Sequence, residues 1–217
     1  MTDWDPALAG ATREAASMNE ILDGIWRWTW FSEEKGMNFN GYAVKLPDGL
    51  VLVDPAYADE SVWREIEKLD KPSLVLLTNK DHERASDELR RRWNVPVAIH
   101  EAEAPLLAVK PERTFGDGDV AAGALRAIRF RRLKSPGECA FFWKDRRLLF
   151  VGDAVTGHPA GRLGLVKKHL DQSAAVLDDL KILLEFDFDA ILMGDGEPML
   201  QKAKAALRDF CRIRPAP

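Results

Sequence analysis

The sequence predicts an α/β fold in which helices cover a mixed or parallel sheet. In the first half of the chain, apolar runs typical of strands alternate with segments of helical spacing, which is the pattern of strand–helix–strand units. The second half is richer in strand-like runs and ends in further helical segments. No repeat, low-complexity stretch or composition break divides the chain. We therefore expect a single domain over residues 1–217, with residues 1–19 as an N-terminal extension.

The first half is expected to alternate strands with helices. Residues 25–31 alternate in the way of a strand whose aromatic face, Trp26, Trp28 and Trp30, packs in the core rather than forming a ligand platform. Pro47-Asp48-Gly49 predicts a hairpin turn. Further strands are expected at 42–46, 50–53, 74–77 and 95–99, and helices at 59–69 and 83–92.

The second half is expected to hold more strands than helices. Apolar runs predict successive strands, and later segments have helical spacing. The expected strands are 125–133, 139–143, 147–151 and 190–193, and the expected helices are 172–185 and 198–210.

Composition and charge narrow the classes of function. The chain has 31 basic and 35 acidic residues in a mixed arrangement, so its net charge of −4 argues against a nucleic-acid-binding surface. No apolar stretch approaches the roughly 20 residues that span a bilayer, and residues 1–16 lack the apolar core of a signal peptide. We expect a cytoplasmic protein with no membrane contact, whose two cysteines are reduced structural thiols.

Polar residues follow several of the apolar strands, where each strand ends. Residues 79–84 follow one strand and residues 134–138 another, while Asp153 and Asp195 each follow a Gly at the end of a third and a fourth strand. Ligands of open α/β sheets bind beyond the carboxyl ends of the strands. These polar segments are therefore the candidate site.

Five short motifs occur in order between residues 20 and 200. They are Leu52-Val53-Asp54-Pro55, Thr78-Asn79-Lys80-Asp81-His82-Glu83-Arg84, Lys134-Ser135-Pro136-Gly137, Val151-Gly152-Asp153 and Met193-Gly194-Asp195-Gly196. Their order resembles the metallo-β-lactamase-fold hydrolases, which carry Asp-Thr-Gly, Thr-His-x-His-x-Asp-His, His-Thr-Pro-Gly, Gly-Asp and Gly-His-Gly in these places. The resemblance implies a four-layer αββα sandwich of two mixed sheets flanked by helices, with the motif loops converging at one edge.

The departures from that superfamily pattern fall on its metal ligands. Only Asp153 keeps the usual residue type, and the chain has four histidines, too few for a five-histidine di-zinc site. The substituted positions are Asn79 and Asp81 in place of two histidines, Glu83 and Arg84 in place of an Asp and a His, and Lys134 and Asp195 in place of the later histidines.

Charge at the converging loops leaves two alternatives open. Four carboxylates, those of Asp81, Glu83, Asp153 and Asp195, carry −4, and Arg84 and Lys134 carry +2. One divalent cation would neutralise the remaining −2. Oxygen ligands suit Mg²⁺, Mn²⁺ or Ca²⁺ better than Zn²⁺, so a di-zinc centre is not expected. Alternatively, Lys134 and Arg84 occupy the place of the metal in a salt-bridged network.

The first functional hypothesis is a hydrolase that uses one divalent ion on an ester or phosphoester. Its metal ligands would be Asp81, Asp153 and Asp195, with help from His82, and Asp153 would serve catalysis through the ion. Lys134 or Arg84 would stabilise a developing oxyanion, and His158 would perform acid–base chemistry. The expected substrate contacts are Asn79, Ser135 and His158.

The second hypothesis is a metal-free pseudoenzyme that acts as a small-molecule-binding or regulatory module. Its ligand pocket would lie near residues 26–30 and His158. Under both hypotheses the expected partner is a small molecule rather than a nucleic acid or a membrane, and the oligomeric state, a homodimer included, is left open.

Overall fold

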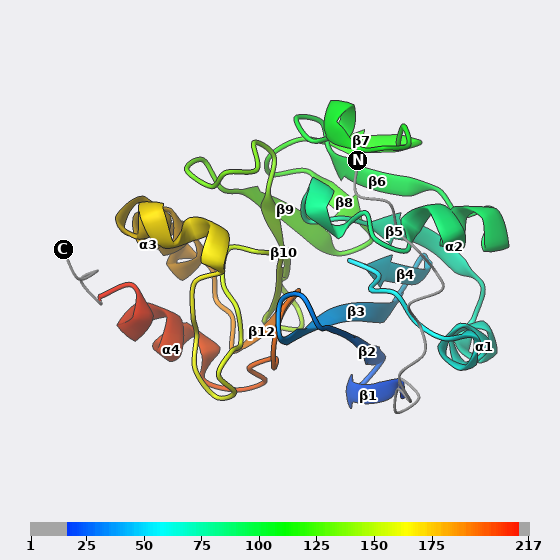
Figure 1. The fold of residues 1–217 in the computed structure, drawn as a ribbon, viewed down its shortest axis with the longest axis horizontal. Coiled ribbons are helices and arrows are strands. Elements are labelled where there is room, and N and C mark those ends of the chain that lie inside the picture. The colour runs from blue at the N-terminus through cyan, green and yellow to red at the C-terminus, as the bar shows by residue number, and fades with distance from the viewer. Residues whose placement is uncertain (1–16, 213–217) are drawn as a thin grey trace.

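Two β-sheets pack face to face between two layers of helices (Figure 1). The structure is a computed structural model that describes residues 17–212. Helices α1 (Glu60–Leu69) and α2 (Ser86–Trp93) cover one sheet, and α3 (Ser173–Leu180) and α4 (Ala203–Phe210) cover the other. This is the αββα sandwich that the sequence predicts, and the prediction is confirmed.

The first sheet has seven strands in sequence order, β1 to β7. Strands β1 to β4 pair antiparallel and β4 to β7 pair parallel, so the sheet is mixed. Helix α1 lies in the crossover from β4 to β5 and α2 in that from β5 to β6, while the crossover from β6 to β7 holds only a short 3₁₀ helix at Ala104–Leu106. The strands are β1 (Asn19–Leu22), β2 (Ile25–Ser32), β3 (Met37–Leu46), β4 (Gly49–Val53), β5 (Pro72–Leu76), β6 (Val97–His100) and β7 (Arg113–Phe115).

The second sheet has five strands in the order β12-β11-β10-β9-β8. Its pairs are antiparallel except for β11 with β12, which are parallel. The strands are β8 (Val120–Ala122), β9 (Leu125–Arg129), β10 (Cys139–Trp143), β11 (Leu148–Val151) and β12 (Ala190–Met193). Short 3₁₀ helices complete the structure: η2 (Lys80–His82), η3 (Ala104–Leu106), η4 (Lys167–Gln172) and η5 (Lys181–Glu185).

Strand β4 shows how one run of apolar residues fills two cores. Val51 and Val53 point into the layer between the sheets. Leu50 and Leu52 point to the opposite face, where they pack under α1. Successive side chains of a strand alternate between its faces, so a strand covered on both faces is apolar throughout.

The tryptophan stripe of β2 belongs to the outer core, as predicted. Trp28 is fully buried, donates from its indole N–H to the carbonyl of Ala56 at 3.0 Å, and meets Trp63 of α1 edge to face. Trp26 and Trp30 pack against the same cluster. The aromatic face therefore holds α1 onto the sheet.

Two predicted helices begin later than their spacing suggests. The helix expected at 83–92 begins at Ser86, because η2 precedes it and Arg84 has a φ of 32° that an α-helix does not allow. The helix expected at 198–210 begins at Ala203, because Lys202 is left-handed with a φ of 57°.

Three further expectations differ from the structure. The strand expected at 125–133 ends at Arg129, because the amides of Arg131 and Arg132 donate to the Asp179 carboxylate at 2.7 Å instead of to a neighbouring strand. The helix expected at 172–185 is divided among η4, α3 and η5. Of the extension expected at residues 1–19, residues 1–16 lie outside the described residues, and Asn19 already begins β1.

The four α-helices among the described residues are 8 to 10 residues long, whereas roughly 20 residues span a bilayer. Within residues 17–212, none of the helices is long and apolar enough to cross one.

We expect Phe150→Ala to lower the free energy of unfolding by about 3–5 kcal/mol, the usual cost of removing a buried aromatic ring. Phe150 is 1% exposed between the sheets and meets Tyr42 edge to face, so its loss leaves a cavity. Phe31→Ala is the matched control, because Phe31 is 53% exposed, and should cost less than about 0.5 kcal/mol. Equal losses in urea denaturation would contradict this description of the core.

Candidate functional site

The carboxyl ends of strands from both sheets meet at one edge of the sandwich. Tyr42 and Asn40 of β3 donate to the carbonyl of Met193 at the end of β12, at 2.6 and 2.8 Å. The amide of Cys139 in β10 donates to the carbonyl of Thr78 after β5 at 3.0 Å. These hydrogen bonds join the two sheets and bring the loops that follow β4, β5, β11 and β12 together.

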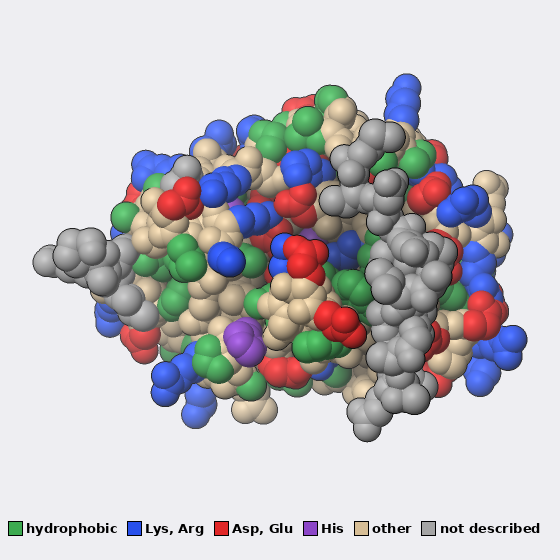
Figure 2. Space-filling view, in the orientation of Figure 1, with side chains coloured by type: hydrophobic (Ala, Val, Ile, Leu, Met, Phe, Trp, Pro, Cys, Tyr) green, Lys and Arg blue, Asp and Glu red, His purple; other side chains and the backbone are tan. Residues whose placement is uncertain are grey.

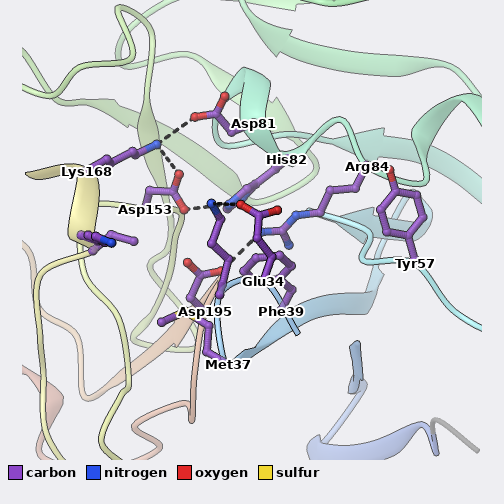
Figure 3. A pocket seen from close by; sticks show the side chains of 13 residues that line it. Glu34, Met37, Phe39, Tyr57, Asp81, His82, Arg84, Asp153, Lys168 and Asp195 are labelled. Carbon is purple, nitrogen blue, oxygen red and sulfur yellow. Dashed lines mark hydrogen bonds and ion pairs between the residues drawn. The ribbon is translucent and has the colours of Figure 1, made fainter. Parts of the chain in front are cut away.

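A cleft of about 920 Å³ opens at this edge. Figure 2 shows charged side chains of both signs gathered near the centre of this face. The charged side chains that line the cleft are Glu34, Lys35, Asp81, His82, Arg84, Asp153, Lys167, Lys168 and Asp195, and the other lining residues are Met37, Phe39, Tyr57 and Val166. Figure 3 shows most of them pointing toward a common centre.

His82 lies buried between two carboxylates. Its Nδ1 is 2.9 Å from Asp54 Oδ2, and its Nε2 is 3.0 Å from Asp153 Oδ1. Asp54 is itself fixed, because it accepts hydrogen bonds from the amide and hydroxyl of Thr78 at 2.8 and 2.7 Å. Burial and Arg84 lower the pKa of His82, but Asp54 and Asp153 outweigh them and raise that pKa to about 10. The ring is therefore an imidazolium at neutral pH.

Lys168 of η4 places its ammonium on two carboxylates. It pairs with Asp81 Oδ2 at 2.9 Å and with Asp153 Oδ2 (Figure 3). Burial tends to raise the pKa of Asp153, but His82 and Lys168 hold that pKa far below its ordinary value. Burial tends to lower the pKa of Lys168, but its pairs with Asp153 and Asp81 raise it. Both groups are therefore charged.

Glu138 differs from these carboxylates because, within residues 17–212, it forms no ion pair. It is fully buried, and neither of its carboxyl oxygens has a hydrogen-bond partner within the described residues. Burial, with the charge of Asp153, raises the pKa of Glu138 to about 8. Glu138 is therefore mostly neutral at pH 7, which avoids the cost of an unpaired buried charge.

Arg84 crosses the floor of the cleft to Asp195. Its guanidinium donates to Asp195 Oδ1 and to the carbonyl of Asn40, both at 3.3 Å, and lies 4.5 Å from the ring centre of Phe39. Burial and the charge of Asp153 raise the pKa of Asp195. The aromatic contact and the backbone contact fix the direction of the guanidinium.

Two glycines before site carboxylates are required by close packing. A Cβ on Gly152 would lie 2.3 Å from the hydroxyl of Thr78, and a Cβ on Gly194 would lie 2.5 Å from Cε1 of His82. Both distances are far below van der Waals contact. The Gly-Asp pairs of the sequence therefore allow Thr78 and His82 to sit against the ends of β11 and β12.

The structure brings five of the predicted site residues together and separates four others. Asp81, His82, Arg84, Asp153 and Asp195 line the cleft. The other four have different surroundings: Lys134 is exposed and pairs with Asp171 at 3.1 Å, Ser135 donates to buried Glu103 at 2.9 Å, Asn79 caps η2 by accepting from the Asp81 amide at 2.8 Å, and His158 is exposed on a loop.

The expected placement of Lys134 beside the carboxylates is wrong, because Lys168 occupies that position. Sequence reasoning missed Lys168, which lies in a stretch of charged residues without a motif, and gave Asp54 no role. It also missed the apolar wall, Met37, Phe39 and Tyr57, which comes from segments outside the motifs. Asp54 was detectable from its place at the end of a buried strand.

The donor atoms of His82, Asp153 and Asp195 lie within 4.8 Å of one another and form the one such group within residues 17–212. Within the described residues, no second group of three such donors accompanies it. A single ion would compete with Lys168 for Asp153 and with Arg84 for Asp195.

The imidazolium of His82 predicts a pH dependence of stability. A pKa raised from 6.5 to about 10 on folding stabilises the fold fully below pH 6.5, and this stabilisation is lost as the pH rises through 10. We expect the difference in unfolding free energy between wild type and His82→Gln to shrink steadily from pH 6 to pH 10, measured by denaturation in the presence of chelator.

The control for this measurement is His158→Gln, on the exposed loop, which should change the unfolding free energy little across the same range. A wild-type minus His82→Gln difference that stays constant or grows with pH would show that His82 is not held as an imidazolium.

Comparisons with known proteins agree with this architecture. The family model described as "Metallo-beta-lactamase superfamily" matches residues 20–213. A curated protein of Bacillus subtilis (strain 168), "Probable metallo-hydrolase YqgX", is 27% identical over 179 residues, which cover 72% of this chain and 84% of that protein.

Solved structures show the same fold at low sequence identity. A metallo-β-lactamase from Erythrobacter litoralis, with β-mercaptoethanol in its active site, has a TM-score of 0.68 and 18% identity, covering 93% of this chain and 98% of that one. The protein TTHA1623 in a di-iron-bound form has a TM-score of 0.61 and 24% identity, covering 82% and 95%. Because the family model spans almost the whole described chain, this protein belongs to the metallo-β-lactamase superfamily.

Proposed function

We propose that this chain binds a small organic anion in the cleft without using a metal ion. The observation that carries the proposal is that every carboxylate lining the cleft already has a cation of the chain as its partner. Lys168 pairs with both Asp81 and Asp153. Lys80 is a second cation on Asp81, and the imidazolium of His82 is a second cation on Asp153. Arg84 pairs with Asp195, and Glu34 pairs with Lys35 at 2.7 Å. The cleft therefore lacks the −2 charge that would call for a divalent ion.

The cleft has cationic groups to spare. Lys167 lines it and forms no ion pair within residues 17–212. Arg84 has more N–H donors than its two contacts at 3.3 Å use, and an arginine fork suits a carboxylate or phosphate group. An anionic group between Lys167 and Arg84 would use both.

Part of the cleft lining is apolar or aromatic. Met37 and Phe39 from β3, Tyr57 and Val166 contribute this part. Small-molecule sites commonly combine an apolar lining with a few placed polar groups. The ligand that fits both the cationic and the apolar lining is an organic anion with an apolar or aromatic body.

The test is calorimetric titration of benzoate and phenyl phosphate into the protein with chelator present, beside neutral benzamide. We expect both anions to bind and benzamide to bind much more weakly. Lys167→Met should weaken anion binding about two- to fivefold, as loss of an exposed charge does. Arg84→Lys keeps the charge opposite Asp195 but loses the fork, and should weaken binding about tenfold or more.

The matched control is Lys144→Met, an exposed lysine in the turn between β10 and β11 that does not line the cleft; its affinity should equal that of wild type. Anion binding that chelator abolishes, or that none of the cleft variants changes, would refute the proposal.

A second candidate function is a hydrolase with one divalent ion, as in the first sequence hypothesis. The observation that favours it is the grouping of His82, Asp153 and Asp195 within 4.8 Å, together with the description of the Bacillus relative as a probable metallo-hydrolase. Such an ion would polarise an ester or phosphoester and supply an activated water. To hold it, Asp153 and Asp195 would have to exchange their present cationic partners, and His82 would have to lose a proton.

Elemental analysis of the purified protein separates the two candidates. The metal-free proposal predicts less than about 0.1 ion per chain, and a melting temperature that Mn²⁺, Mg²⁺, Ca²⁺ and Zn²⁺ leave unchanged, since a ligand stabilises only a fold that binds it. A stoichiometric ion, with turnover of ester or phosphodiester substrates that chelator removes, would instead establish the hydrolase.

A further inference from the structure

We infer that Lys168 keeps divalent cations out of the cleft, and that removing its ammonium converts the cleft into a divalent-cation site. This inference rests on the proposed metal-free function and names the side chain responsible for it. Lys168 lies where the superfamily pattern implies metal ligands, and its ammonium balances the carboxylate charges of Asp81 and Asp153.

Lys168 bridges carboxylates that belong to different sheets. Asp81 lies in η2 after β5 of the first sheet, and Asp153 follows β11 of the second, while Lys168 reaches both from η4 (Figure 3). The side chain of Lys168 is 27% exposed and that of Asp153 is 9% exposed. Charges shielded from water in this way interact more strongly than surface pairs, so an incoming cation has to displace a well-held ammonium.

Removal of that ammonium leaves an oxygen of Asp153 without a cation. Oδ1 of Asp153 faces His82, while Oδ2 faces Lys168 and would lose its partner. A carboxylate oxygen left without a partner in a cleft shielded from water is costly, and a hard divalent ion with carboxylate oxygen ligands relieves that cost. An oxygen of Asp195 lies within 4.8 Å of an oxygen of Asp153, and Asp81 lies on the other side of the vacated position. The ligands of the ion would therefore be carboxylate oxygens, while His82 stays on Asp54 and Asp153.

The neighbouring lysine provides a matched control. Lys167 lines the same cleft and changes the net charge by the same amount when substituted, but it holds no carboxylate within residues 17–212. A general electrostatic effect on cation affinity would appear in both variants. Displacement of one specific ammonium would appear in Lys168 variants alone.

The experiment is calorimetric titration of Mn²⁺ into wild type, Lys168→Met and Lys167→Met, with thermal unfolding of each at increasing Mn²⁺. We expect Lys168→Met to bind one Mn²⁺ at least about tenfold more tightly than the other two proteins, and its melting temperature to rise with Mn²⁺ concentration. Asp153→Asn added to Lys168→Met should abolish the gain. Lys168→Gln, whose amide can still donate to Asp153, is the second variant if Lys168→Met folds poorly.

The inference is overturned if Lys168→Met and Lys168→Gln bind Mn²⁺ no more tightly than wild type, or if Lys167→Met gains as much. Neither result touches the proposed function, which is judged on wild-type binding of benzoate in chelator. Conversely, if wild type does not bind benzoate, the proposed function fails. The comparison of Mn²⁺ binding between the Lys168 and Lys167 variants would then still test the role of Lys168.

Discussion

The carboxylate of Asp153 is the group on which the rest of the cleft depends. It follows β11 and receives His82 on one oxygen and Lys168 on the other. Through His82 it is linked to Asp54 at the end of β4, and through Lys168 to Asp81 after β5. A buried charge must be paired, so these contacts fix side chains from four segments around one atom group.

Carboxylates and cations alternate around this edge of the two sheets. Buried carboxylates at strand ends need compensating charge, whichever cation supplies it. Here an imidazolium, an ammonium and a guanidinium are in contact with Asp153 and Asp195. The architecture is thus compatible with different chemistry at the same edge of the sheets, and fold alone does not determine function.

The sequence predicts the layers of this fold well and the site only in part. Long apolar runs such as those of β4, β5 and β11 determine strands, because a strand buried on both faces has few other solutions. The motifs located Asp153 and Asp195 and the turn that holds His82. They could not locate Lys168, because its position depends on the path of η4 after an irregular loop, and a lysine among charged residues has no distinguishing pattern. The predicted place of Lys134 is wrong because its ammonium pairs with exposed Asp171 instead.

The close packing at Gly152 and Gly194 shows that the glycine of a Gly-Asp motif reports on packing, not on the chemistry of the site. A threonine packs against Gly152 and a histidine against Gly194, and neither position has space for a Cβ. Any chain with this packing needs glycine there, whatever reaction it performs. A search that recognises Gly-Asp at such positions detects the geometry of the scaffold. Such a search does not distinguish a site in which the aspartate contacts an ion from one in which it contacts a lysine.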